Sequence, residues 1–153
     1  MYTTFRCRQI CYEHRWFFRS NYGYMRMIPK KEILLVDDDC DVREVLKLTL
    51  ERHGYKTFEA SNGAHAIELC KLKTFDLVIA DIYMPGMDGI KFIEILQGFS
   101  PKTMVIAISG GESCHFFKSS LQLNTALHKG AILTLKKPIK EAELLGVVKK
   151  YAG

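Results

Sequence analysis

Polar side chains suited to phosphoryl or metal chemistry follow four short apolar runs of the chain. They are Asp37, Asp38 and Asp39 after the first run, Asp81 after the second, Ser109 after the third and Lys137 after the fourth. Carboxylates that lie within a few ångströms of one another repel and cannot all stay ionised without a cation. Mg²⁺ suits such a cluster because it prefers one or two carboxylates together with water and phosphate oxygens. If the fold brings these residues together, the sequence predicts a magnesium site that handles phosphoryl groups.

Within this set, the residue types suggest different roles. An aspartate beside a bound metal can attack phosphorus and form an acyl phosphate, while a lysine neutralises charge on the transferred oxygens. Asp81 is the nucleophile in this interpretation, and Lys137 is the counter-charge. Taken singly the residues indicate little, since acidic residues and serines after strands are commonly helix N-caps and a Lys-Pro pair is commonly a turn. Asp39 or Asp41 is expected to cap the first helix in this way.

The apolar runs alternate with segments of helical spacing. Residues 33–36 form the continuous apolar run of a strand buried on both faces, and residues 42–53 have helical spacing before Gly54. The further predicted strands are residues 56–60, 77–80, 104–108 and 132–135, and the further predicted helices are residues 63–72, 90–97, part of 114–129 and 141–151. This alternation predicts an α/β fold, a five-stranded parallel sheet with helices on both faces. Ligands bind beyond the carboxyl ends of the strands in such sheets, where the polar residues above would meet.

Three segments resemble the signature of response-regulator receiver domains, which serve in bacterial two-component signalling. They are residues 34–39 (LLVDDD), residues 78–89 (VIADIYMPGMDG) and Lys137-Pro138. The resemblance covers about residues 30–152 and implies the (βα)5 flavodoxin-like receiver fold. It also implies a phospho-accepting response regulator of a two-component phosphorelay, a regulatory domain that catalyses only its own phosphorylation and dephosphorylation.

The resemblance further implies which residues hold the metal and the phosphoryl group. Asp81 becomes the phosphoacceptor. The implied Mg²⁺ ligands are Asp38 and Asp81 directly, Asp37 through water, and the main-chain carbonyl of Tyr83. Ser109 is expected to hydrogen-bond the phosphoryl group and follow it inward. Lys137 takes the place of the family's lysine, whose bond to the following proline is usually cis.

The loops around these residues carry expectations of their own. Asp88 is expected to cap the helix that follows the Met-Pro-Gly-Met-Asp-Gly loop. Thr134 stands where the family often has Tyr or Phe, and the segment from Ser109 to Gly130 is several residues longer than the family's commonest form. We therefore expect the response to phosphorylation to run mainly through that longer segment.

Residues 1–29 differ in character from the rest of the chain. They are rich in arginine and aromatic residues and show no steady period. Most of the net charge of +5 belongs to them, since they hold five arginines against one glutamate. We expect this leader to be disordered or no part of the domain, which is placed at residues 30–153. Met25 or Met27 is a candidate true start.

Composition narrows the class of protein. The hydrophobic fraction of 48% and the charged fraction of 25% are average for soluble globular proteins. No apolar run approaches the roughly 18 residues that cross a bilayer, and arginines interrupt any N-terminal signal sequence. Five cysteines at irregular spacing argue against a secreted disulfide framework. We expect a cytoplasmic protein with no membrane segment.

Two other functions fit parts of the sequence. Magnesium-dependent phosphatases of the haloacid-dehalogenase type use two aspartates spaced two apart, which Asp39 and Asp41 could mimic, but the Asp81 run would then go unexplained. The leader could bind nucleic acid, because guanidinium groups contact phosphates and aromatic rings stack on bases. A zinc site in the leader would have only three candidate ligands, Cys7, Cys11 and His14.

The predicted signalling route follows from the chain's end. With no further domain after Gly153, we expect no DNA-binding domain and a signal that leaves by protein contact. The expected partners are a sensor histidine kinase or phosphotransfer protein upstream and a protein target downstream.

Overall fold

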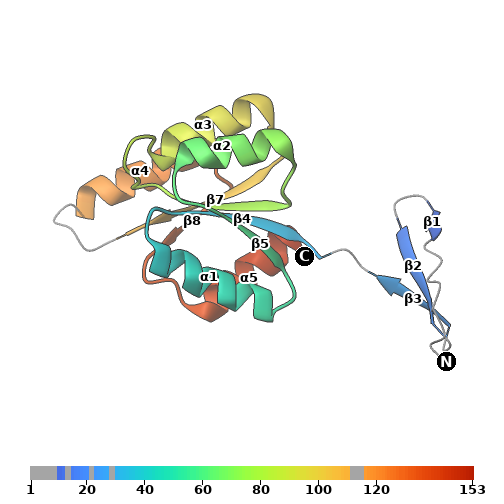
Figure 1. Ribbon diagram of the computed structural model, residues 1–153. Coiled ribbons are helices and arrows are strands. Elements are labelled where there is room, and N and C mark those ends of the chain that lie inside the picture. Colours follow the sequence, from blue (N-terminus) through green and yellow to red (C-terminus); the bar gives the residue numbers. More distant parts are fainter. Residues whose placement is uncertain (1–9, 13–14, 21–22, 28–29, 111–115) are drawn as a thin grey trace. The chain divides into compact units, whose positions relative to one another are not determined.

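The chain divides into two compact units, Met1–Lys30 and Lys31–Gly153. The computed structural model describes residues 10–12, 15–20, 23–27, 30–110 and 116–153. In the first unit, three strands form an antiparallel sheet in the order β1 (Ile10–Tyr12), β2 (Arg15–Ser20) and β3 (Gly23–Met27) (Figure 1). The sequence did not predict these strands, and that residues 1–29 are no part of the receiver stays a prediction. The candidate zinc ligands Cys7 and His14 lie outside the described residues.

The second unit alternates strands and helices, as the sequence predicts. Its strands are β4 (Glu32–Val36), β5 (Lys56–Ala60), β6 (Leu77–Asp81), β7 (Met104–Ser109) and β8 (Leu133–Lys136). Its helices are α1 (Cys40–Arg52), α2 (Gly63–Leu72), α3 (Gly89–Phe99), α4 (Phe116–His128) and α5 (Glu141–Ala152). The five strands form one parallel sheet in the order β5-β4-β6-β7-β8, which confirms the predicted sheet.

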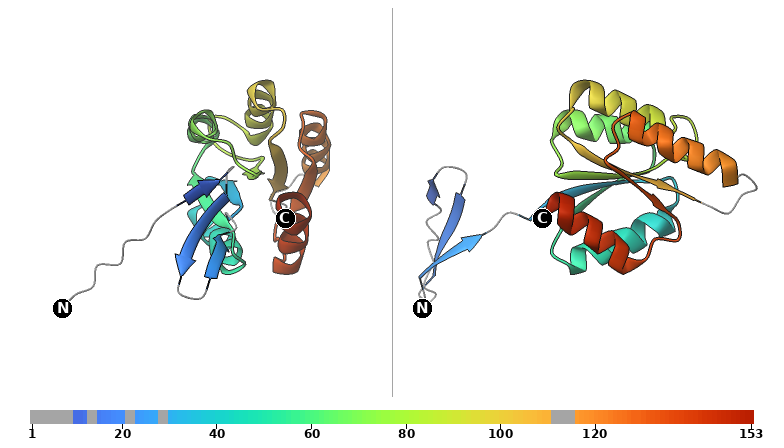
Figure 2. Two further views of the ribbon diagram at one scale, coloured as in Figure 1. Left: turned by 90° about the vertical axis from the view of Figure 1, so that its right-hand side faces the viewer. Right: turned by 180° about the vertical axis from the view of Figure 1, so that it is seen from behind.

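Helices cover both faces of this sheet. Figure 2 shows α1 and α5 on one face and α2, α3 and α4 on the other. Side chains of the central strand alternate between the two cores, with Val78 and Ala80 on the α2, α3 and α4 side and Leu77 and Ile79 on the α1 and α5 side. All four are buried, which explains why the strand is a continuous apolar run in the sequence. No helix in the described part of the chain is long and apolar enough to span a bilayer.

The strand order reverses direction next to β4. The chain passes from β4 outward to β5 and then returns to β6 on the other side of β4. The carboxyl ends of β4 and β6 therefore lie side by side, with Val36 paired to Ala80, while their connections lead away in opposite directions. This is the switch point at which open α/β sheets bind ligands.

Several elements differ from the prediction by one residue at an end. β6 includes Asp81 and β7 includes Ser109, so these two residues end their strands instead of following them. Both are held in the ladder, Asp81 opposite Ile108 and Ser109 opposite Lys136. Their main chains are thereby fixed by the sheet and not by a loop.

Two leucines of α1 test how that helix packs on the sheet. Leu50 is fully buried, whereas Leu48 on the same helix is 51% exposed. Leu50→Ala should lower the free energy of unfolding by about 2 to 5 kcal/mol because it leaves a cavity. Leu48→Ala should change it by about 0.5 kcal/mol or less. Urea denaturation measures both, and equal losses would contradict this orientation of α1.

Candidate functional site

Three carboxylates meet where β4 and β6 end. Asp37 and Asp81 are buried, and Asp38 is exposed. One oxygen from each of the three lies within 4.8 Å of the others. Carboxylates this close to one another require positive charge nearby. The cluster has the oxygen ligands that a hard divalent cation prefers.

Lys137 brings a positive charge to the two buried carboxylates. Its Nζ donates to Asp37 Oδ2 and to Asp81 Oδ2, each at 2.7 Å. The side chains of Asp37 and Asp81 are only 3% and 6% exposed, and that of Lys137 is 21% exposed. The main-chain N–H of Lys137 donates to the Ser109 carbonyl, and the Lys137-Pro138 bond is cis, as the resemblance implied. The structure therefore brings residues at or just beyond the carboxyl ends of β4, β6, β7 and β8 to one edge of the sheet.

Burial and neighbouring charges act in opposite directions on the pKa values of Asp81 and Lys137. Burial raises the pKa of Asp81 above its ordinary value, and the charge of Asp37 acts in the same direction, while the hydrogen bond and charge of Lys137 oppose the rise without cancelling it. Burial works to lower the pKa of Lys137, but its hydrogen bonds and charge interactions with the two carboxylates outweigh burial and raise that pKa. The lysine thus stays protonated, and ionised Asp81 is the strained member of the group.

Asp37 is held at each of its polar atoms. Its N–H donates to the Ala60 carbonyl at 3.2 Å, and its Oδ1 accepts from the Asp39 N–H at 2.9 Å. Lys137 occupies Oδ2, and Nη1 of Arg43 donates to the Asp37 carbonyl at 2.7 Å. A role for Arg43 was not predicted from the sequence. One signal could have found it, because a basic residue near the N-terminus of a helix is disfavoured by the helix dipole and so indicates a specific partner.

Ser109 is buried at the same edge of the sheet without a side-chain partner. It is 1% exposed, and its Oγ has no hydrogen-bond partner within the described residues. Leaving a buried hydroxyl unpaired costs about 1 to 3 kcal/mol. A Cβ added at the next residue, Gly110, would lie 3.9 Å from Lys137 Cδ, which places this end of β7 beside the lysine. A ligand oxygen at the site could satisfy the hydroxyl.

Two aspartates near the site serve as helix caps, as predicted. Asp39 caps α1 by accepting from the N–H groups of Asp41 at 2.9 Å and Val42 at 3.3 Å. Asp88 caps α3 by accepting from the Lys91 N–H at 2.7 Å. Asp41 is exposed on α1, so Asp39 and Asp41 do not form a buried catalytic pair. The phosphatase alternative therefore has no support in this geometry.

The loop between β6 and α3 lies against the main chain of Asp81. The Tyr83 N–H donates to Asp81 Oδ1 at 3.2 Å, and the Gly89 N–H donates to the Ile82 carbonyl at 2.9 Å. A Cβ on Gly89 would lie 2.0 Å from the Asp81 carbonyl oxygen. Only glycine permits α3 to begin this close to the strand that carries Asp81. The need for glycine at this position was also not predicted from the sequence, in which Gly89 is only the last residue of the Met-Pro-Gly-Met-Asp-Gly loop.

The two departures from the family's commonest form lie on β8 and after β7. Thr134 is half-buried in β8, opposite Ala107. Residues 111–115 lie outside the described residues, and α4 follows them. That the response to phosphorylation runs through the segment after Ser109 stays a prediction.

Comparisons with known proteins identify the family of the second unit. Residues 33–149 match the family model described as the response regulator receiver domain. The chain is 31% identical over 121 residues to sporulation initiation phosphotransferase F of Bacillus subtilis (strain 168), a match that covers 79% of this chain and 93% of that protein. It is 32% identical over 118 residues to transcriptional activator protein PfeR of Pseudomonas aeruginosa, covering 76% of this chain but only 36% of that protein.

A solved structure is similar over the same region. The CheY-like response regulator receiver domain protein from Methanospirillum hungatei JF-1 matches with a TM-score of 0.71 at 28% identity, covering 80% of this chain and 93% of that one. The chain thus spans nearly all of some relatives and about a third of others. The match lies in the second unit, which holds the acidic cluster.

Two glycines of α3 test the close approach to Asp81. Gly89→Ala should lower the free energy of unfolding by about 1 to 3 kcal/mol, because the added methyl group overlaps the Asp81 carbonyl. Gly98→Ala is the matched control, since a Cβ there meets nothing within 4 Å, and it should stabilise the helix by up to about 1 kcal/mol. Thermal denaturation of both variants measures the difference. A Gly89→Ala variant as stable as the wild type would contradict the contact.

Asp81→Asn tests the electrostatic strain, and the sign follows from the raised pKa. A carboxyl whose pKa is higher in the folded than in the unfolded state binds its proton more tightly when folded, so the free energy of unfolding falls as pH rises between the two values. In metal-free buffer at pH 7, Asp81→Asn should therefore be more stable than the wild type. The difference should vanish below about pH 4, where the wild-type carboxyl is also neutral.

Denaturant unfolding across this pH range, with a chelator present, measures the effect. A variant less stable than the wild type at pH 7 would show that the attraction between Asp81 and Lys137 exceeds the penalty of burying the carboxylate.

Proposed function

The chain belongs to the response-regulator receiver family, and on this premise we propose that it accepts a phosphoryl group on Asp81 beside a bound Mg²⁺. One observation carries the proposal: Nζ of Lys137 contacts both Asp81 and Asp37 at 2.7 Å. A nucleophilic carboxylate and a second carboxylate for a metal thus both lie within hydrogen-bond distance of one cation, which can serve the transferred oxygens. This is the set of groups that phosphoryl transfer to an aspartate needs.

The residues present fit Mg²⁺. Three carboxylate oxygens lie within 4.8 Å of one another, and a divalent cation would offset their mutual repulsion. The proposed ligands are Asp38 and Asp81 directly, Asp37 through water, and the main-chain carbonyl of Tyr83. When bound, Mg²⁺ neutralises charge on the phosphoryl oxygens and helps to align them for in-line transfer.

The protein's own groups perform the transfer in this proposal. A carboxylate oxygen of Asp81 attacks phosphorus, the bond from phosphorus to the donor breaks, and an acyl phosphate remains on Asp81. Lys137 shifts its ammonium group from the Asp81 carboxylate toward a transferred oxygen. Ser109 Oγ, which has no hydrogen-bond partner among the residues that the structure describes, donates to another transferred oxygen. Attack of water on phosphorus later releases inorganic phosphate and restores the carboxylate.

The proposed partners follow from a phosphoryl group that arrives from outside and must be reported. Upstream we propose a sensor histidine kinase or a phosphotransfer protein as donor, and downstream a protein target reached by surface contact. The match to a relative named as a phosphotransferase, over nearly its whole length, supports a place in a phosphorelay. The domain is regulatory, and we propose no chemistry beyond its own phosphorylation and dephosphorylation.

Phosphorylation by a small donor tests the proposal. Incubation with acetyl phosphate and Mg²⁺ should add one base-labile phosphoryl group, seen as a mass shift in intact-protein mass spectrometry. Asp81→Asn should abolish the shift, and a chelator should prevent it. Asp88→Asn is the matched control, because asparagine caps a helix as well as aspartate does and should leave phosphorylation intact.

Two results would contradict this assignment. A mass shift that survives in Asp81→Asn would place the phosphoryl group elsewhere. A shift that is abolished in Asp39→Asn but kept in Asp81→Asn would favour the phosphatase-type pair instead.

A further inference from the structure

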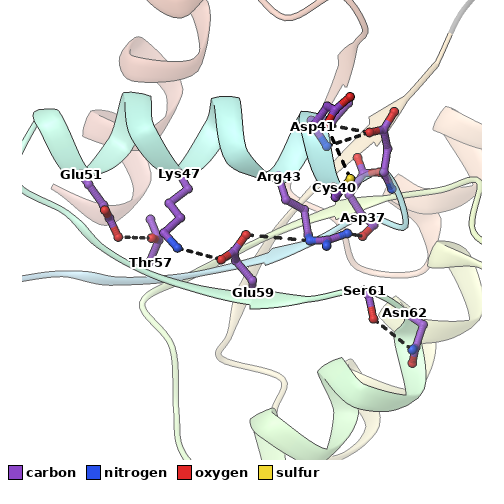
Figure 3. Close-up of polar contacts among 12 residues, drawn as sticks. Asp37, Cys40, Asp41, Arg43, Lys47, Glu51, Thr57, Glu59, Ser61 and Asn62 are labelled. Atoms are coloured by element: carbon purple, nitrogen blue, oxygen red, sulfur yellow. Dashed lines mark hydrogen bonds and ion pairs between the residues drawn. The ribbon is translucent and has the colours of Figure 1, made fainter.

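A set of polar side chains joins α1 to β5 beside the acidic loop, residues 37–39 between β4 and α1 (Figure 3). Nη1 of Arg43 donates to the Asp37 carbonyl at 2.7 Å, and Nε of Arg43 lies 3.9 Å from Glu59 Oε1. Nζ of Lys47, one turn further along α1, donates to Glu59 Oε2 at 2.9 Å. Glu59 on β5 thus faces two cations from α1. Of these two, Arg43 also contacts Asp37.

The two cations differ in burial. The Arg43 side chain is 16% exposed and that of Lys47 is 39% exposed. A mostly buried guanidinium is stable only where its donors and its charge are matched, and its planar fork can serve an ion pair and a carbonyl at once. Glu59 supplies the opposite charge and the Asp37 carbonyl supplies an acceptor. Arg43 is therefore anchored at one end by β5 and holds the acidic loop at the other.

The carbonyl that Arg43 holds belongs to a residue whose carboxylate lies in the site. The Asp37 N–H donates to the carbonyl of Ala60, which follows Glu59 on β5. Both main-chain polar groups of Asp37 are thus tied to β5, one directly and one through Arg43. Asp38 is exposed and directly follows Asp37 in the chain. The main-chain position of Asp37 therefore determines where the Asp38 carboxylate approaches the buried carboxylates of Asp37 and Asp81.

Charge and geometry make opposite predictions for Arg43. Its positive charge near the acidic cluster repels a divalent cation, so charge alone predicts tighter Mg²⁺ binding when Arg43 is removed. Groups that orient metal ligands have the opposite effect, because their loss lets the ligands move out of place. The sign of the change therefore separates the two roles.

We propose that Arg43, anchored by Glu59, is a positioning residue that fixes the Asp37 carbonyl and so holds the Asp37-Asp38 pair in the geometry that binds Mg²⁺. The inference rests on the proposed magnesium site. Arg43 contacts the Asp37 carbonyl and Glu59, and it acts on the site through the main chain of Asp37.

Calorimetric titration of the full chain with Mg²⁺ tests the inference. Arg43→Gln should weaken Mg²⁺ binding about tenfold, the lower end of the loss seen when a group that orients metal ligands is removed. Arg43→Lys should fall between Arg43→Gln and the wild type, since lysine keeps the charge and a donor but not the planar fork. Lys47→Gln is the matched control, because it removes the other ion pair of Glu59 without touching Asp37, and it should leave the affinity unchanged.

The free energy of unfolding in chelator is measured for each variant, so that a general loss of stability is separated from a loss of affinity. An Arg43→Gln variant with unchanged or tighter Mg²⁺ binding overturns the inference, as does an equal loss of affinity in Lys47→Gln. If Arg43→Gln does not fold, Arg43→Lys decides, and unchanged binding in that variant overturns the inference. If the wild type binds no Mg²⁺, both the proposed magnesium site and this inference are wrong. If the wild type binds Mg²⁺ and the Arg43 variants bind it equally well, only the inference is wrong.

Discussion

Two carboxylates buried side by side must share positive charge, and much of this structure follows from that constraint. Asp37 and Asp81 are almost fully buried, and one ammonium group, that of Lys137, bonds both. The sheet order makes the pair possible, because β4 and β6 are adjacent parallel strands whose carboxyl ends lie side by side. Gly89 then allows α3 to begin directly against Asp81. A single lysine for two buried carboxylates and a third at the surface leaves the group in need of a further cation.

The site is held in an unfavourable state that the surrounding fold supports. Burial raises the pKa of Asp81, and the buried Ser109 hydroxyl has no partner among the described side chains. Apolar cores on both faces of the sheet supply the stability that such a site requires. A phosphoryl group and a divalent cation would relieve both defects at once, since one brings acceptor oxygens and the other brings charge. The Asp81 carboxylate and the Ser109 hydroxyl, which destabilise the free protein, are thus the groups whose interactions a bound ligand would complete.

Much of the fold and the location of the site could be predicted from local signals in the sequence. The apolar runs predicted parallel strands, and caps were expected at Asp88 and at either Asp39 or Asp41, because capping depends on neighbours a few residues away. Asp81 and Ser109 prove to be the last residues of their strands, a difference that the apolar pattern cannot resolve because the ladder continues past the apolar side chains. The roles of the site residues came from the resemblance to a family, not from their spacing.

The sequence could not show contacts that depend on how distant elements pack. The bond from Arg43 to the Asp37 carbonyl requires the angle of α1 on the sheet, and the need for glycine at Gly89 requires the distance between α3 and β6. The three strands of the first unit were missed because residues 1–29 show no alternation of apolar and polar residues. Local patterns thus predict helices and strands, whereas the contacts that hold the site residues in place depend on how those helices and strands pack in the folded protein.

The central claim is that Lys137 and a divalent cation meet the same need of Asp37 and Asp81. Lys137 contacts an oxygen of each carboxylate, so its ammonium group opposes a metal both by charge and by occupying ligand oxygens. The most direct test is calorimetric titration of Lys137→Met with Mg²⁺, compared with the wild type in the same buffer. The account predicts tighter Mg²⁺ binding in Lys137→Met. Weaker binding would show that the lysine is needed to hold the carboxylates in place and would contradict the claim.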